Sequence, residues 1–196
     1  MNPVTMRTRL NVLAAVLVVA SACGEPGRVP APNIPPYRSF DQKTRILRVR
    51  QGDEEMNAAI DRARSTLPHL VQRLTHAPAG MTYLGVKVRL ARSDGPAEFI
   101  WLEDVTYADG KIAGKLTEDA ELFPEFRVGD PVRVEPGQIT DWMTVENGRA
   151  CGGFTQRIVM AEAGAKVLAA YLAEMGIPRL PLGDVVCDSG PTGSER

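Results

Sequence analysis

Acidic and aromatic side chains gather in two short stretches of this sequence. The stretch WLED carries Trp101, Glu103 and Asp104, and the stretch DWM carries Asp141 and Trp142. Two neighbouring carboxylates can divide into a proton donor and a proton acceptor, as in glycoside hydrolysis, when their environments separate their pKa values. Tryptophan faces can stack on sugar rings or cover apolar ligands. If the two stretches lie side by side, these residues predict one polar groove.

Further polar residues follow DWM within a short span: Asn147, Arg149 and Thr155. Together with the two stretches above, they form the candidate binding surface. A structural interpretation competes, because both tryptophans are typical core residues, Asp141 can cap a turn and Arg149 can pair with it. Arg149 as an anion receptor is the less favoured alternative.

Glycines in the same region favour the structural interpretation. Asn147-Gly148 is the strongest two-residue hairpin signal in the chain, because both positions tolerate positive φ. Gly152-Gly153 fits a β-bulge or a close crossing of two backbones. The span therefore indicates a hairpin with a bulge more than a catalytic loop.

No pattern in the sequence predicts a metal site or a cofactor. His69 and His76 lie seven residues apart on one helical face, about 10 Å along the axis, which is too far for one zinc ion. We interpret that face as solvated. The sequence has no Walker loop, G-x-S-x-G, H-E-x-x-H or C-x-x-C motif.

The elements that position these residues begin with an amphipathic helix. Apolar residues recur at alternating spacings of four and three between Asp53 and Leu74. Asp53 is a suitable N-cap, and Glu54 and Glu55 complement the positive end of the helix dipole. Pro68 cannot donate a hydrogen bond to the carbonyl of Arg64, which predicts a kink or a break near Thr66.

Six short strands joined by compact turns follow this helix, and a second helix spans about 161–175. The expected strands are 82–90, 97–105, 111–116, 132–134, 139–145 and 150–159. The pattern predicts an α+β fold in which the strands form a small bent antiparallel sheet or an open barrel.

Residues 1–22 have the features of a secretory signal. Arg7 and Arg9 precede a short apolar run and then small residues. The run is too short for a transmembrane helix, which needs roughly 20 apolar residues. Ala20-Ser21-Ala22-Cys23 resembles the bacterial lipobox, which implies cleavage before Cys23 and lipid on that residue. We expect anchoring in the cell envelope, with Gly24 permitting the outer membrane if the cell is Gram-negative. A secreted protein is the alternative.

Residues 23–52 combine the lipidated cysteine with a proline-rich tether. An N-terminal arm lying along the domain is the alternative for Ile34, Tyr37 and Phe40. The domain is predicted at 53–188 and a disordered tail at 189–196. The 174 residues that follow the leader suit one domain. Their 21 basic and 24 acidic residues give a formal charge of −3, and the absence of a basic stripe argues against nucleic-acid binding.

Cys151 and Cys187 form a pair if Cys23 carries lipid. Disulfides persist in oxidising compartments, and this one closes a loop of about 36 residues, which stabilises by roughly 3–4 kcal/mol in the loop-entropy model. Two free thiols are the alternative.

The sequence also resembles a known family. The blocks DEEMNAAIDRAR, VKVRL, EFIWLEDV, GKIAGKL, RVGDPVRVEPGQITDWM and NGRACGGFTQRI occur in that order between about Asp53 and Val159, and they resemble DUF2314, the YegJ-like family of bacterial proteins. Thr117-Glu118-Asp119 departs from the Asn-x-Pro-like turn expected there, and the cysteine pair and second helix look like additions. The resemblance implies a compact domain and carries no established activity.

These observations favour a lipid-anchored envelope protein whose domain binds a partner protein or a small ligand without turning it over. An envelope hydrolase that uses Glu103 or Asp104 with Asp141 is the enzymatic alternative. A structural lipoprotein that holds envelope layers together is the third interpretation.

Overall fold

The computed structural model describes residues 17–20, 38–50, 52–92 and 96–180. Several predicted features lie outside the described residues: Cys23 with the proline-rich segment as far as residue 37, Cys187, and the tail at 189–196.

The structure has two consecutive helices in the segment between Asp53 and Leu74 where the sequence predicts an amphipathic helix. Helix α1 spans Glu54–Ser65 and α2 spans Leu67–Thr75. Asp53 caps α1, since its side chain accepts a hydrogen bond from the N–H of Met56 at 2.9 Å. Pro68 stands in the first turn of α2, where its missing N–H costs nothing. The predicted cap and the predicted break near Thr66 are both confirmed.

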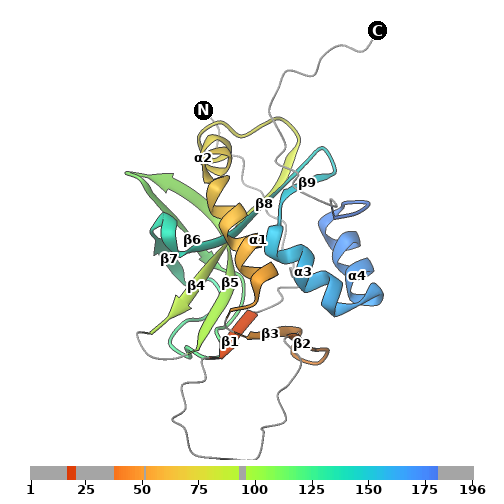
Figure 1. Ribbon diagram of the computed structural model, residues 1–196. Coiled ribbons are helices and arrows are strands. Elements are labelled where there is room, and N and C mark those ends of the chain that lie inside the picture. The colour runs from red at the N-terminus through yellow and green to blue at the C-terminus, as the bar shows by residue number, and fades with distance from the viewer. Residues whose placement is uncertain (1–16, 21–37, 51, 93–95, 181–196) are drawn as a thin grey trace, which may run out of the picture.

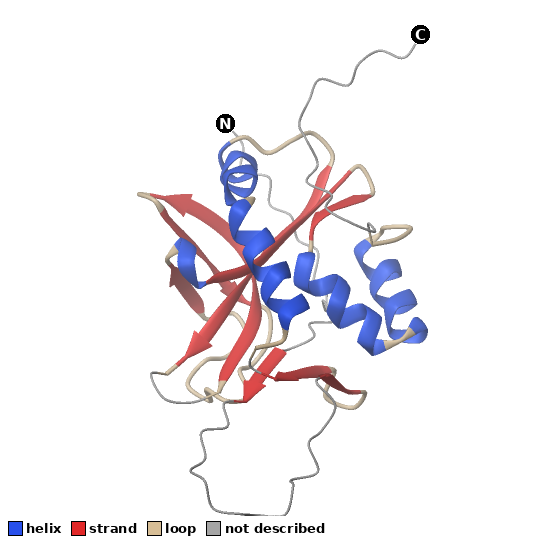
Figure 2. Cartoon of the chain, in the orientation of Figure 1, coloured by secondary structure: helices blue, strands red, loops and turns tan. Residues whose placement is uncertain are grey.

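The strands form one sheet, which Figure 2 shows in red. Its strands are β1 (Leu17–Ala20), β2 (Arg38–Asp41), β3 (Ile46–Arg50), β4 (Met81–Ala91), β5 (Ala97–Ala108), β6 (Lys111–Leu116), β7 (Pro131–Val134), β8 (Ile139–Glu146) and β9 (Arg149–Gly152). The main order is β2-β3-β1-β5-β4-β8-β9, while β6 pairs with β5 and β7. All pairs are antiparallel except β1 with β3. The α+β class is confirmed, and the sheet does not close into a barrel.

The C-terminal part of the fold differs from two predictions, the strand at 150–159 and the second helix at about 161–175. The segment expected as a strand from 150 to 159 leaves the sheet at Gly152, and helix α3 begins at once, over Phe154–Ala163. Helix α4 then spans Ala165–Met175, with Gly164 between the two helices. A strand pattern misled here because apolar residues are buried on most sides of α3 and show no helical alternation.

Two strands lie inside the segment predicted as tether. The hairpin of β2 and β3 falls within 23–52, and Leu47 and Val49 are buried in the core. Phe40 packs against the same cluster. The described elements of the sheet therefore include strands that precede Asp53 in the chain.

Strand β1 comes from the predicted leader. It lies between β3 and β5 and is the element through which the β2–β3 hairpin joins the sheet. Figure 1 shows it at the lower edge of the molecule beside these strands. Cleavage before Cys23 would therefore remove one strand from this sheet.

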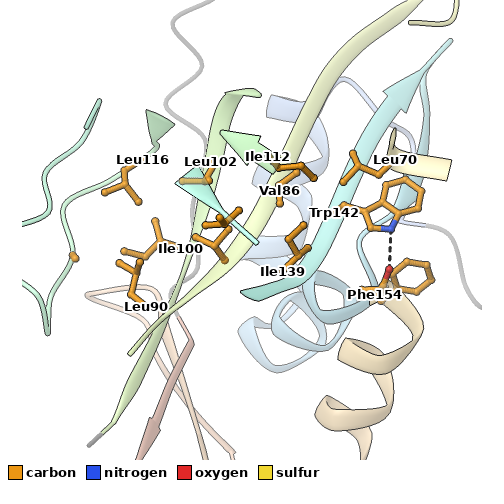
Figure 3. Packing of buried hydrophobic residues seen from close by; sticks show 14 of the residues in the cluster. Leu70, Val86, Leu90, Ile100, Leu102, Ile112, Leu116, Ile139, Trp142 and Phe154 are labelled. Atoms are coloured by element: carbon orange, nitrogen blue, oxygen red, sulfur yellow. Dashed lines mark hydrogen bonds between the residues drawn. The ribbon is translucent and has the colours of Figure 1, made fainter. Parts of the chain in front are cut away.

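Most of the core is divided between two clusters of apolar residues. Along β5 they alternate: Phe99 and Trp101 belong to one cluster, and Ile100 and Leu102 to the other, as expected for the two faces of a strand. Figure 3 shows the second cluster, in which Trp142 lies beside Phe154 and Leu70. Among the described helices, none is long and apolar enough to span a membrane.

Candidate functional site

Asp141 lies in the core at the start of α3 and accepts hydrogen bonds from five donors. Its Oδ1 accepts from the backbone N–H groups of Trp142 and Phe154 at 2.8 and 3.0 Å. Its Oδ2 accepts from the N–H and the hydroxyl of Thr155 at 2.8 and 2.7 Å and from the N–H of Gln156 at 3.1 Å. Burial raises the pKa of Asp141, whereas Lys87 and the donated hydrogen bonds oppose that rise. Because all five partners donate, they stabilise the ionised form of the carboxylate, which caps the helix.

Lys87 of β4 is fully buried beside this cap. Its Nζ donates to Gln156 Oε1 at 3.2 Å and to Thr155 Oγ1 at 3.4 Å, and lies 4.9 Å from the centre of the Trp101 ring. Gln156 Oε1 accepts a second bond, from Trp101 Nε1, at 3.3 Å. Burial lowers the pKa of Lys87 to about 8, and the charges of Asp141 and Glu118 oppose this effect.

Lysine, threonine and aspartate in this order have the donors and acceptors of an activated nucleophile. However, Lys87, Asp141 and Thr155 are each 0% exposed, so a substrate has no route to the Thr155 hydroxyl. The network instead joins β4, β8 and α3 through hydrogen bonds that each buried polar group requires. Its role is to fix the packing of these elements.

Glu118, just after β6, is the second ionisable group near Lys87. Its side chain is half-buried, and Oε1 has no hydrogen-bond partner among the described residues. Burial raises the pKa of Glu118 to about 8, with Lys87 opposing and Glu98 adding to the rise. Near neutral pH this carboxyl group therefore holds a proton.

A cleft of about 560 Å³ opens elsewhere, between the first residues of β4, the bend in β5 and the end of α4. Its lining residues are Met81, Thr82, Tyr83, Leu84, Glu103, Asp104, Val105, Gly148, Glu174, Met175 and Gly176. The walls are mainly apolar, and three carboxylates stand among them. This size and lining are typical of small-molecule or side-chain binding sites.

A β-bulge in β5 brings the acidic residues to the cleft. Glu103 pairs with Lys115 of β6, and the next pair is Thr106 with Ala113, so β5 carries one more residue than β6 between these pairs. Asp104 in the bulge has φ +51°, which is rare for a residue other than glycine. Bulges redirect side chains beside binding sites, and this one places Glu103 and Asp104 next to each other on the cleft.

The electrostatics of the cleft centre on Glu103. Its Oε1 is shielded from solvent and has no hydrogen-bond partner in the part of the chain that the structure describes. Burial raises the pKa of Glu103, and the carboxylates of Asp104 and Glu174 raise it further. Asp104 is partly compensated by an ion pair with Lys115 at 3.0 Å. A shielded acceptor in an acidic surrounding favours a ligand group that donates hydrogen bonds and carries positive charge.

The predicted surface divides into three groups in the structure. Glu103 and Asp104 line the cleft, and Asn147 and Arg149 are exposed on either side of Gly148, which lines it too. Asp141 and Thr155 belong to the buried cap. Trp101 and Trp142 are core residues in different clusters, so they do not form one groove. Trp142 donates to the Thr66 hydroxyl at 2.9 Å.

The cysteines add little to either site. Cys151 is buried in β9, while Cys187 and Cys23 lie outside the described residues. The bridge and the lipid therefore stay predictions.

Sequence reasoning missed the ionisable residues Lys87, Glu118 and Glu174. Lys87 lies in the predicted strand 82–90, and no feature of that stretch of sequence indicates that the lysine is fully buried. Glu174 lies on the predicted second helix, and the sequence does not indicate that this helix packs near Glu103. Within the described residues, no group of three or more His, Cys, Asp or Glu side chains is arranged to hold a metal ion.

Comparison with known proteins places the chain in a family. The family model DUF2314, described as "Uncharacterized protein conserved in bacteria", matches residues 53–178. A protein of Neisseria meningitidis serogroup B described as "Putative ankyrin repeat protein" is 32% identical over 117 residues, which cover 56% of this chain and 46% of that protein. The uncharacterised protein YegJ of Escherichia coli is 26% identical over 102 residues, which cover 52% of this chain and 65% of YegJ.

The chain thus spans about half to two thirds of the length of these curated relatives. No solved structure matches. The matched region contains the buried cap and all the lining residues of the cleft. On the extent of the family match, this chain belongs to the DUF2314 family of bacterial proteins.

Proposed function

We propose that this protein is a non-catalytic binding module of the bacterial cell envelope, and that its cleft receives a positively charged group on an apolar segment. The observation that supports binding most directly is the shielded Glu103 Oε1, which has no partner among the described residues yet lines a cleft of about 560 Å³. A buried acceptor without a partner costs free energy that a donating ligand would recover.

The apolar walls of the cleft indicate the chemistry of the remainder of the ligand. Met81, Tyr83, Leu84 and Met175 surround the carboxylates, so an extended alkyl chain that ends in an ammonium or guanidinium group matches both parts of the lining. Methionine side chains adapt to ligands of different shape. A lysine or arginine side chain in an apolar segment of a partner protein has this chemistry.

The geometry gives less support to the hydrolase. That mechanism pairs Glu103 or Asp104 with Asp141, but both oxygens of Asp141 are occupied by donors at the start of α3. Asp141 does not line the cleft. The three carboxylates thus do not share an open site, as acid–base catalysis on one substrate requires.

Three soluble apolar peptides that differ only in a central lysine, glutamine or glutamate test the binding proposal. We expect calorimetry to detect binding of the lysine peptide to the parent protein and a loss of about tenfold in affinity in Glu103→Gln, equivalent to about 1.4 kcal/mol. Glu121→Gln is the matched control, because Glu121 is exposed and lies outside the cleft. Equal binding of the lysine and glutamine peptides, or unchanged affinity in Glu103→Gln, would reject the cationic ligand.

Export and lipid anchoring form the second part of the proposal. They rest on Arg7 and Arg9, the short apolar run and the small residues before Cys23. Several acyl chains hold a protein stably on a membrane, whereas a single chain holds it marginally. Cys23→Ser should move the protein from the membrane fraction to the soluble fraction. A serine variant that still sediments with membranes as the parent does would refute lipid anchoring.

A further inference from the structure

The place of β1 in the sheet defines a slot that is one strand wide. β1 pairs in parallel with β3, from Leu17 opposite Leu47 to Ala20 opposite Arg50. On its other side it pairs antiparallel with β5, from Leu17 opposite Phe99 to Val19 opposite Ala97. Among the described strands, β1 lies between β3 and β5 in the sheet order. Without this strand, two hydrogen-bonding edges would face each other across the gap that one strand fills.

The β2–β3 hairpin is held in place by contacts that do not involve β1. Arg38 of β2 binds both oxygens of Asp53, with Nε and Nη2 at 2.9 and 2.7 Å, and pairs with Glu55 and Glu162 at 2.7 and 3.4 Å. Gln42 donates to the carbonyl of Ala163 at 3.0 Å. The hairpin is therefore tied to the start of α1 and to α3, so it keeps its position beside the slot.

Apolar contacts reinforce this attachment. Leu47 and Val49 of β3 belong to the same buried cluster as Ile158 and Val159 of α3, and Phe40 packs against that cluster. Moving β3 across to pair directly with β5 would break these contacts together with the Arg38 ion pairs. These contacts therefore oppose closure of β3 onto β5 when β1 is absent.

We infer that, once the leader is removed, the slot between β3 and β5 accepts an extended apolar strand from a partner protein. This inference rests on the proposed function, because cleavage before Cys23 removes β1. The occupant would run parallel to β3 and donate backbone hydrogen bonds to both edges, as in other β-augmentation complexes. The leader sequence LVVA, rich in β-branched residues, already indicates which chemistry fits.

The residues that flank the slot agree with an apolar occupant. Leu47 and Val49 on one side and Ala97 and Phe99 on the other are all buried. Glu98, between the last two, is also buried, and its carboxylate accepts the N–H groups of Glu121 and Leu122 at 2.8 and 2.9 Å. Arg48 flanks the slot opposite the same position of β1 as Glu98 and pairs with Glu121 at 3.7 Å, so both of these charges already have partners.

The test uses mature protein purified from detergent-solubilised membranes, with intact mass measured first. A lysine-flanked peptide of sequence VLAAVLVVA is the probe, and the same peptide with proline at the second and fourth positions from its C-terminal end is the control, because proline cannot donate to a ladder. We expect the probe to slow exchange by about tenfold or more at those amides of residues 47–50 and 97–99 that do not pair with β2 or β4, and the control to leave it unchanged.

The outcomes of this experiment distinguish failure of the strand slot from failure of the proposed cleavage before Cys23. A mass that still includes residues 1–22 would overturn both, since β1 then remains the resident strand. A mass that lacks them, with no effect of the probe, would overturn the strand slot alone. Strong protection, before any peptide is added, of those amides in 47–50 and 97–99 that do not pair with β2 or β4 would also overturn it, because β3 would then have closed onto β5.

Discussion

Asp141 illustrates how a buried carboxylate is tolerated at the scale of one residue. Transfer of an ionised carboxylate from water to the interior is costly unless donors replace the lost water. Three backbone N–H groups of the first turn of α3 and one hydroxyl group supply most of that replacement. The same bonds satisfy helix donors that would otherwise have no partner. The carboxylate and the helix start therefore depend on each other.

Asp141→Asn should lower the free energy of unfolding by about 2–4 kcal/mol, because a neutral amide turns one acceptor into a donor that faces N–H groups. Urea denaturation followed by circular dichroism measures this change. Asp61→Asn is the control, since Asp61 is exposed on α1 and should change stability by no more than about 0.5 kcal/mol. Equal stability of the two variants would show that the cap contributes little.

Glu118 predicts a pH dependence of stability. Burial raises its pKa from 4.5 to about 8 in the folded protein. The folded state then binds more protons than the unfolded state between these two values, so the contribution of Glu118 is present below about pH 4.5 and is lost as pH rises through about 8. Lys87 affects stability at higher pH than Glu118 does. Its pKa is about 8 in the folded protein and 10.5 in the unfolded chain, so its proton binding differs between the two states in the range from about 8 to 10.5.

Glu118→Gln removes that titration. The free energy of unfolding of the parent minus that of the variant should fall from about pH 5 to about pH 8, by on the order of 2 kcal/mol after allowance for partial exposure of the side chain, because only the parent ionises at this position. Urea denaturation at several pH values measures it, and Glu121→Gln serves as the control. A difference that stays constant with pH would mean that Glu118 is ionised throughout.

At the scale of elements, the sequence predicted those features that depend on interactions between residues close together in the chain. The cap at Asp53, the break before Pro68 and the turn at Asn147-Gly148 depend on neighbours in sequence, and the structure confirms them. The start of α3 was missed because its cap, Asp141, precedes the helix by more than a dozen residues and reaches it across the β8–β9 hairpin. Propensity and periodicity do not contain that long-range contact.

Alanine substitutions at Gly152 and Gly148 distinguish the cost of backbone strain from the cost of a steric clash. Their φ values are nearly equal, at +73° and +72°. A Cβ on Gly152 would lie 2.2 Å from the carbonyl oxygen of Trp142, whereas the nearest atom to a Cβ on Gly148 is 3.9 Å away. Gly148→Ala should therefore cost about 1 kcal/mol from strain alone, and Gly152→Ala at least about 3 kcal/mol.

Thermal unfolding of both alanine variants checks this difference. If Gly152→Ala and Gly148→Ala melt at the same temperature, the close crossing of β9 and β8 does not restrict position 152. The order expected here matches the prediction from sequence that Gly152-Gly153 marks a close approach of two backbones.

At the scale of the whole molecule, the fold class was predictable and the site was only partly so. In the structure Glu103 and Asp104, two residues of the candidate binding surface, line the cleft, and alternation and turn residues indicated the strands of the α+β domain. They did not reveal that Glu174 of α4 meets Glu103 across a cleft, because strand order and helix docking are decided by packing. Strand β1 was missed for another reason: its residues suit a leader as well as they suit a sheet, since both need a short apolar run.

The pairing of Cys151 with Cys187 is the prediction that connects the domain to its compartment. Cys151 is 0% exposed in β9, so native alkylation cannot distinguish a bridge from a shielded thiol. Alkylation in denaturant without reductant can: a bridged pair takes no adduct, whereas free thiols take one each. We expect intact mass to show no adduct on this pair until a reductant is added, and reduction or Cys187→Ser to lower the unfolding free energy by roughly 3–4 kcal/mol. Adducts on both cysteines before reduction, in protein from the envelope fraction, would refute the bridge and weaken the case for an oxidising compartment.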